Sequence, residues 1–303
     1  MQMKYGKIEG VDKPISKLVL GTDFFFEDKE GELYQLIDAY FEMGGNAFDL
    51  AHIYGGGAGQ RIVGRWMKSR NARDKVVLLD KGCHPYGHPR VSPKYIEEDL
   101  NENLARLGIE QEDVFVLHRD DPKQDIAPLL DSLNEQIAKG KISAFGASNW
   151  TTTRLDEALS YAKRHGLRGF SLSSNNLSLA EPNEPMWEGC VSLGETELLW
   201  HRRNRFPLFA WSPAARGWFA GVRDPDVTRV YENDENHRRL ERAKILAKRH
   251  GATPHQIALA YVLCQDFPTW AIIGARTIDE LRQNVQSLEI ELSKEEMLFL
   301  KRG

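Results

Sequence analysis

LVLG (Leu18–Gly21) is followed by LYQLIDAYFEM (Leu33–Met43), by Gly44 and Gly45, and by NAFD (Asn46–Asp49). The first and last segments have the length of strands. In the middle segment, apolar residues recur at the i, i+3, i+4, i+7 spacing of a helix with one buried face. A glycine after such a helix supplies the left-handed residue that ends it. The stretch therefore predicts a strand, a covering helix and a second strand.

The same alternation continues along nearly the whole chain. Further strands are predicted at 76–80, 114–117, 142–146, 169–172, 208–211 and 270–273, and further helices at 60–68, 93–107, 126–138, 154–164, 238–248, 254–264 and 278–285. Strands that alternate with helices form parallel sheets covered by helices. Eight such units in this length favour a closed (β/α)₈ TIM barrel of the α/β class, as one domain over residues 1–303. The stretches 181–194 and 223–235 are predicted to be loops at its mouth.

Composition limits the classes of function. The 303 residues include 40 Lys and Arg and 44 Asp and Glu, so the net charge is −4, which argues against nucleic acid as a partner. No apolar run approaches the ~18 residues of a membrane span, and the first residues have no signal-peptide pattern. Three cysteines without a CxxC pair suit a reducing compartment. We expect a cytoplasmic protein, monomeric or homo-oligomeric, whose partner is a small molecule.

Ionisable residues follow three successive predicted strands, where a barrel carries its chemistry. They are Asp49 and Tyr54, then Lys81, then His118. A cation close to a phenol stabilises the phenolate, so we expect a lowered pKa for Tyr54, and a carboxylate offsets the cost of burying that cation. The set therefore predicts a proton relay at an oxygen atom, with no metal. Taken singly, each residue has a structural alternative: a helix cap, a packed ring, a surface lysine or a hydrogen-bonded core histidine.

The chain resembles the aldo-keto reductase superfamily. Six blocks carry the resemblance in the same order: FDLAHIYG (48–55), LDKG (79–82), VLHRD (116–120), GASNW (146–150), WSP (211–213) and IGAR…QN (273–284). The resemblance implies an NAD(P)H-dependent oxidoreductase that interconverts carbonyl compounds (aldehydes, ketones or sugar-like substrates) and alcohols. It makes Tyr54 the general acid/base, tuned by Lys81 and Asp49, while His118 orients the substrate.

The resemblance also implies a cofactor site across the barrel mouth. Ser148 and Asn149 match the residues that bind the nicotinamide carboxamide, and Trp211 matches the ring that stacks on the nicotinamide. The full set of expected cofactor residues is Gly21, Thr22, Asp49, Ser148, Asn149, Ser174, Trp211, Ser212, Arg216, Gly274, Arg276, Glu280, Gln283 and Asn284.

Three of the implied assignments leave alternatives. A glutamine usual after the sixth strand is replaced by Ser174, or is displaced to Asn175 or Asn176. Arg276 is suited to the adenosine phosphate, because a guanidinium forks onto phosphate oxygens. Glu280 disfavours a 2′-phosphate and suits the 2′-hydroxyl of NAD. We favour NADP(H), with NAD(H) possible; Arg276 and Glu280, at i and i+4, also have the spacing of an ion pair.

Substrate contacts are expected from Tyr54 and His118, and from His84 and Tyr86 in the loop after Lys81. His84 and His88 have the spacing of helical metal ligands, but Pro85, Gly87 and Pro89 exclude a regular helix there. A barrel that binds NADPH as a redox sensor, without significant turnover, is the alternative function. The complete proton relay favours the enzyme.

Overall fold

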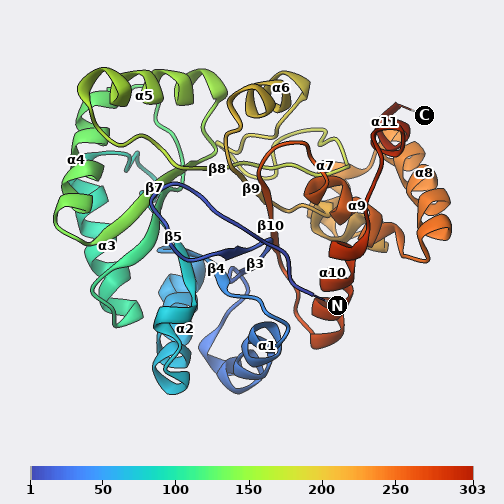
Figure 1. The fold of residues 1–303 in the computed structure, drawn as a ribbon, viewed down its shortest axis with the longest axis horizontal. Helices are drawn as coiled ribbons and strands as arrows, with labels where there is room; N and C mark the ends of the chain where they lie inside the picture. The colour runs from blue at the N-terminus through green and yellow to red at the C-terminus, as the bar shows by residue number, and fades with distance from the viewer. Residues whose placement is uncertain (1, 303) are drawn as a thin grey trace.

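The computed structural model describes residues 2–302, within which eight parallel strands close into a barrel surrounded by helices (Figure 1). The barrel strands are β3 (Leu18–Gly21), β4 (Ala47–Ala51), β5 (Val77–Gly82), β6 (Glu112–Leu117), β7 (Ile142–Ser148), β8 (Ser173–Ser174), β9 (Leu208–Trp211) and β10 (Thr269–Ile273). Strand β10 pairs with β3 and closes the ring in the order β10-β3-β4-β5-β6-β7-β8-β9. The predicted (β/α)₈ fold is confirmed.

The helices lie outside this ring. They are α1 (Glu30–Glu42), α2 (Ala58–Arg70), α3 (Pro93–Leu107), α4 (Ile126–Ala138), α5 (Thr152–His165), α6 (Glu195–Asn204), α7 (Pro225–Tyr231), α8 (Asp234–His250), α9 (Pro254–Leu263), α10 (Ile278–Gln286) and α11 (Lys294–Arg302). Gly44, two residues after α1, has the left-handed φ of 88° that the sequence predicted for the helix stop. No helix in residues 2–302 is long and apolar enough to cross a membrane.

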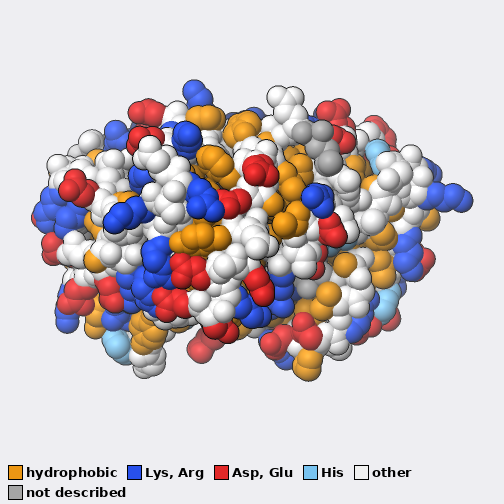
Figure 2. Space-filling view, turned by 90° about the horizontal axis from the view of Figure 1, so that it is seen from below, with side chains coloured by type: hydrophobic (Ala, Val, Ile, Leu, Met, Phe, Trp, Pro, Cys, Tyr) orange, Lys and Arg blue, Asp and Glu red, His pale blue; other side chains and the backbone are white. Residues whose placement is uncertain are grey.

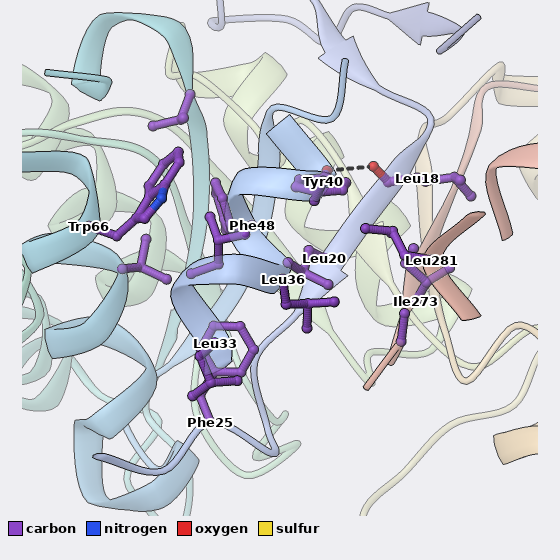
Figure 3. Close-up of a cluster of buried hydrophobic side chains, with 14 of the residues drawn as sticks. Leu18, Leu20, Phe25, Leu33, Leu36, Tyr40, Phe48, Trp66, Ile273 and Leu281 are labelled. Carbon is purple, nitrogen blue, oxygen red and sulfur yellow. Dashed lines mark hydrogen bonds between the residues drawn. The ribbon is translucent and has the colours of Figure 1, made fainter. Parts of the chain in front are cut away.

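Outward-facing strand residues pack against the helices. Around α1 and α2, the buried cluster includes Leu20, Leu36, Phe48 and Trp66 (Figure 3). The Tyr40 hydroxyl lies in the same cluster and donates a hydrogen bond of 2.8 Å to the carbonyl oxygen of Leu18, which ties α1 to β3. Because aliphatic side chains fill both faces of the sheet, the strand ends are held rigidly.

The amino-terminal end of the barrel is closed by a hairpin that the sequence analysis did not predict. Strands β1 (Tyr5–Gly6) and β2 (Ile15–Ser16) pair antiparallel, and this segment crosses the barrel in Figure 1. Ile8, Val11 and Ile15 of this region are buried with the apolar residues of the barrel interior. The interior is therefore a packed core at this end, and the opposite end is left for chemistry.

Two predictions on secondary structure were wrong. The strand expected at 169–172 lies at Ser173–Ser174, where only two residues pair with β7. The stretch 223–235, expected to be a loop, contains α7 and the start of α8. Asp224 caps α7 by accepting a hydrogen bond of 2.8 Å from the backbone N–H of Val227. Helices α6 and α11 were also missed.

The face shown in Figure 2 carries Lys and Arg side chains interspersed with Asp and Glu. Such mixing produces no extended positive surface there for a phosphate backbone.

Candidate active site

Strand alternation builds a polar layer on top of the apolar barrel core. Every second side chain of a barrel strand points inward. On β5, Leu79 belongs to the apolar interior, and the next inward position is Lys81. Strand β4 repeats this relation with Ala47 and Asp49. One step after β6, His118 continues its inward row. The predicted residues therefore meet because their strands are neighbours in the ring.

Lys81 is the centre of this layer. Its Nζ donates a hydrogen bond of 2.5 Å to Asp49 Oδ1 and one of 3.1 Å to the hydroxyl oxygen of Tyr54. Lys81 is 2 % exposed and Asp49 is 3 % exposed. A buried charge needs a partner of opposite sign, and each of these two groups provides it for the other.

A turn of three glycines places Tyr54. Gly55, Gly56 and Gly57 have φ angles of 54°, 59° and 86°, which glycine adopts without a steric penalty. At Gly57 a Cβ atom would lie only 2.6 Å from Nη1 of Arg106, so the Arg106 side chain would have to shift to admit it. The tight turn brings the Tyr54 ring over the barrel mouth and leads directly into α2.

The electrostatics of the pair agree with the sequence analysis for Lys81 but correct it for Tyr54. Burial works against the ammonium, but the charges of Asp49 and Tyr54 raise the pKa of Lys81 above its ordinary value. Burial raises the pKa of Tyr54 to about 12, and the nearby charge of Lys81 opposes that rise without reversing it. The expectation of a net lowered Tyr54 pKa is therefore wrong, because desolvation of the phenolate is the larger effect.

His118 lies beside Tyr54. The two ring centroids lie 5.7 Å apart with nearly perpendicular planes, and Nδ1 of His118 is buried without a hydrogen-bond partner in the part of the chain described. Burial lowers the pKa of His118 far below its usual range, and the charges of Lys81 and Arg119 lower it further. The imidazole is therefore neutral at physiological pH.

A pocket of about 1250 Å³ opens above this layer. It is lined by all four residues of the predicted relay and by His84, and also by most of the predicted cofactor residues: Gly21, Ser148, Asn149, Trp211, Ser212, Arg216, Gly274, Arg276, Glu280, Gln283 and Asn284. Three predicted site residues, Thr22, Ser174 and Tyr86, do not line it.

Thr22 and Tyr86 are engaged elsewhere. The Thr22 hydroxyl donates to the carbonyl oxygen of Asp49 at 2.9 Å, which joins the ends of β3 and β4. Tyr86 is 44 % exposed, and its hydroxyl is 3.2 Å from Nδ1 of His52. Of the two loop residues expected at the substrate, the structure brings only His84 to the site, with its ring centroid 4.8 Å from that of His118.

None of the three candidates for the missing glutamine lines the pocket. Ser174 is buried, and its hydroxyl has no hydrogen-bond partner among residues 2–302. The Asn175 amide bonds the backbone on both sides, accepting from Asn149 N–H and donating to the Trp150 carbonyl oxygen, each at 2.8 Å. Asn176 donates to the carbonyl oxygen of Trp211 at 3.0 Å. These amides shape the strand ends.

Ser148, Asn149 and Trp211 lie together on one wall of the pocket. The Asn149 amide donates to Ser148 Oγ at 3.0 Å, and Asn149 has a left-handed φ of 62°. Trp211 Nε1 is buried without a hydrogen-bond partner in the described chain, and its ring centroid is 6.0 Å from that of Trp187. This wall combines a broad aromatic ring with amide and hydroxyl groups.

Arg276 was expected either to bind the adenosine phosphate or to form an ion pair with Glu280, and the ion pair is wrong. Glu280 Oε2 accepts a hydrogen bond of 2.7 Å from the backbone N–H of Arg276 rather than from its side chain. The Arg276 guanidinium lies 5.9 Å from the ring centroid of Phe24 and has no carboxylate within ion-pair distance in residues 2–302. Arg216 also lines the pocket, and its Nε is buried without a partner there.

Sequence reasoning gave no role to several residues of the pocket. Asp23 lies close enough for its charge to raise the pKa values of Asp49 and Tyr54. His255 binds Asn284 Oδ1 through Nε2 at 3.0 Å. Arg119 follows His118 directly and lines the same pocket. A sequence signal existed for two of them: Asp23 follows a predicted strand within two residues, and Arg119 stands beside a predicted catalytic residue.

Comparison with known proteins identifies the family. The model of the aldo/keto reductase family matches residues 17–301. The chain is 27% identical to norsolorinic acid reductase of Aspergillus flavus, over 93% of this chain and 76% of that protein. It is 29% identical to the uncharacterized oxidoreductase YrpG of Bacillus subtilis, over 98% of this chain and 95% of that protein. A crystal structure of a thermostable aldo-keto reductase with the inhibitor epalrestat shares the fold, with a TM-score of 0.79, 24% identity and 99% coverage of both chains.

Members of this family are oxidoreductases that act on carbonyl compounds and alcohols with nicotinamide cofactors. The family match covers the eight-stranded barrel and the pocket at its carboxyl end. The chain is therefore an oxidoreductase and belongs to the aldo/keto reductase family.

Proposed function

We propose that this enzyme reduces small aldehydes and ketones with NADPH, and that Tyr54 is the proton donor. One observation carries the proposal: Lys81 Nζ lies 3.1 Å from the Tyr54 hydroxyl and 2.5 Å from Asp49, within a pocket large enough for a dinucleotide and a substrate. Single-ligand pockets occupy ~300–1,000 Å³, and this one is larger.

The residues present fit a nicotinamide dinucleotide. The Trp211 ring offers a stacking surface, and Arg216 and Arg276 are guanidinium groups without carboxylate partners in residues 2–302. Phosphates need such cations. The bound nicotinamide supplies the hydride that reaches the carbonyl carbon, while the protein supplies positions and charges.

Side chains of the protein supply the proton for this reaction. With its raised pKa, Tyr54 keeps its hydrogen at neutral pH and can give it to the oxygen of the reduced carbonyl. Lys81 stabilises the phenolate that this transfer leaves, and Asp49 keeps Lys81 charged and in place. Neutral His118 lines the pocket beside Tyr54, so its ring can hydrogen-bond the same carbonyl oxygen.

The preference for NADPH rests on Arg276. Its guanidinium is free of Glu280, so a 2′-phosphate can approach it without first breaking an ion pair. The Glu280 carboxylate is occupied by the backbone of Arg276, which reduces its availability to a 2′-hydroxyl.

Parallel titrations of NADPH and NADH, followed by quenching of tryptophan fluorescence, test the cofactor. We expect tighter binding of NADPH and a loss of that preference in Arg276→Met. Steady-state oxidation of NADPH with small aldehydes tests the reaction. Tyr54→Phe should bind NADPH as the wild type does but lose roughly 10²- to 10⁴-fold in turnover. Full turnover in this variant would refute the proton-donor role. Tight NADPH binding without turnover in the wild type would instead indicate a redox sensor.

A further inference from the structure

Arg119 is a buried cation whose charge no carboxylate balances. It is 8 % exposed and lines the pocket beside His118. Its Nη1 donates to the carbonyl oxygen of His118 at 2.9 Å, and its Nε donates to that of Glu188 at 3.4 Å. Within residues 2–302, Nη2 has no hydrogen-bond partner and no carboxylate lies within ion-pair distance of the guanidinium.

The other buried arginines show that this is an exception. Arg239 and Arg242, 5 % and 9 % exposed, both pair with Glu235, and Arg239 also pairs with Glu181. Burying an ion without a counter-charge is costly, because the protein interior solvates charge poorly. Backbone carbonyl groups offset only part of that cost at Arg119. An anion that enters the pocket would relieve the remaining cost.

The guanidinium is held in place rather than free to swing into solvent. Two hydrogen bonds to backbone carbonyl oxygens hold it, and its stem lies beside Gly189, where a Cβ atom would be in ordinary van der Waals contact with Cδ of Arg119 at 3.4 Å. His84 is close enough that the charge of Arg119 adds to burial, the larger cause, in lowering the pKa of His84. This corner of the pocket is therefore fixed and positive, and it adjoins the ring that faces the reacting oxygen.

The order of strands separates Arg119 from the cofactor phosphates of the proposed function. Arg119 follows β6, and Arg276 follows β10. In the ring β10-β3-β4-β5-β6-β7-β8-β9, these two strands are four apart among eight, on opposite sides of the mouth. Arg216 follows β9, next to β10. An anion that binds Arg119 would therefore belong to the substrate and not to the cofactor.

We propose that Arg119 binds a carboxylate of the substrate, so that the preferred substrates are aldehydes or ketones that carry a carboxylate group. The inference rests on the proposed reductase function and specifies its substrate class. A carboxylate is favoured over a phosphate because one guanidinium balances one negative charge, and its fork matches the two oxygens.

Reduction of carboxybenzaldehydes tests the proposal. The wild type, with NADPH, is measured on the ortho, meta and para isomers and on their methyl esters, which lack the charge. We expect the best isomer to exceed its ester in kcat/KM by roughly tenfold to a hundredfold, the range of a charge-assisted hydrogen bond. Arg119→Met should abolish this ratio and leave the esters' values within about threefold. Arg119→Lys should restore part of the ratio.

Lys123→Met is the matched control, because it removes one positive charge from an exposed position in the same loop, outside the pocket. It should leave the ratio unchanged. Equal kcat/KM values for acids and esters in the wild type, or an equal loss on both in Arg119→Met, would overturn the proposal.

A binding measurement separates this proposal from the proposed function. If neither NADPH nor NADH supports reduction of any of these aldehydes, the reductase assignment fails. Calorimetric titration of benzoate into the protein then still tests whether Arg119 binds a carboxylate. Binding by the wild type that is lost in Arg119→Met supports it. Absent binding, or equal binding by both, refutes it.

Discussion

Replacing Lys81 by methionine removes the cation from the centre of the polar layer while keeping a side chain of similar length. Asp49, 3 % exposed, is then a buried carboxylate without its partner at 2.5 Å. Loss of one member of a buried ion pair costs about 3–5 kcal/mol of unfolding free energy. We expect Lys81→Met to lose stability in this range at neutral pH, and to lose less in acid, where the lone carboxyl group takes up a proton.

The double variant Asp49→Asn/Lys81→Met separates charge from packing. It removes both charges, so no ion is left unpaired, and such neutral replacements are often isoenergetic with the original pair. We therefore expect the double variant to regain most of the stability that the single variant loses.

Activity should behave differently from stability. At 3.1 Å and an effective dielectric constant of about 20, a full charge on Tyr54 would interact with Lys81 by at most about 5 kcal/mol. Part of this energy is gained as the phenolate forms. Both variants should therefore lose turnover by about 10²-fold or more.

Urea denaturation gives the stabilities, and NADPH oxidation with an aldehyde gives the turnover. A Lys81→Met protein as stable as the wild type would refute the buried-pair argument. So would a double variant as unstable as the single one. A double variant that is stable and fully active would show that the reaction does not use the Lys81 charge.

Three further outcomes are expected. The rate of reduction should be flat from about pH 6 to about pH 9, because the pKa of Tyr54 is raised to about 12 and that of His118 is lowered, so neither group titrates in this window; a step near neutral pH would contradict this. Burial raises the pKa of Asp80 from 3.8 to about 7. The protonated carboxyl group therefore contributes to stability fully below pH 3.8, and this contribution is lost as the pH rises through 7. Asp80→Asn should flatten the decline in urea midpoint between pH 3.8 and pH 7. Arg205 is exposed and has a left-handed φ of 50°, so Arg205→Gly should gain about 1 kcal/mol of unfolding free energy. Asn71→Gly, at a φ of 47°, should gain less because asparagine tolerates this conformation. Equal urea midpoints for the wild type and both variants would contradict backbone strain at these positions.

Periodicity in the sequence predicted most of the barrel. The helix at 126–138 and the strand at 208–211 have the predicted limits, because an apolar face of either period has few alternative arrangements. Strand β8 was misplaced because the residues that pair, Ser173 and Ser174, are polar, while the apolar Gly169–Leu172 next to them has the better strand pattern. Helix α7 has seven residues, too few to display a period.

The gathering of the relay could also be expected from sequence, because Asp49, Lys81 and His118 end neighbouring strands of a parallel ring. Its electrostatics could not. Whether burial or Lys81 dominates at Tyr54 depends on how completely water is excluded, and only coordinates define this. The Arg119 guanidinium, which has no carboxylate partner within residues 2–302, is a similar case, since nothing in the order of residues reveals which carboxylates fail to reach it.

Within residues 2–302, the hairpin of β1 and β2 and the packed barrel interior close the amino-terminal end of the barrel, where Ile8, Val11 and Ile15 are buried, so the pocket opens only at the carboxyl end. Cofactor and substrate that enter through the same opening must bind and leave in a fixed order. The ligand that binds deeper in the pocket cannot dissociate until the other has left, so it should be the last to be released. Double-reciprocal plots of rate against substrate concentration, at several cofactor concentrations, should therefore intersect rather than run parallel.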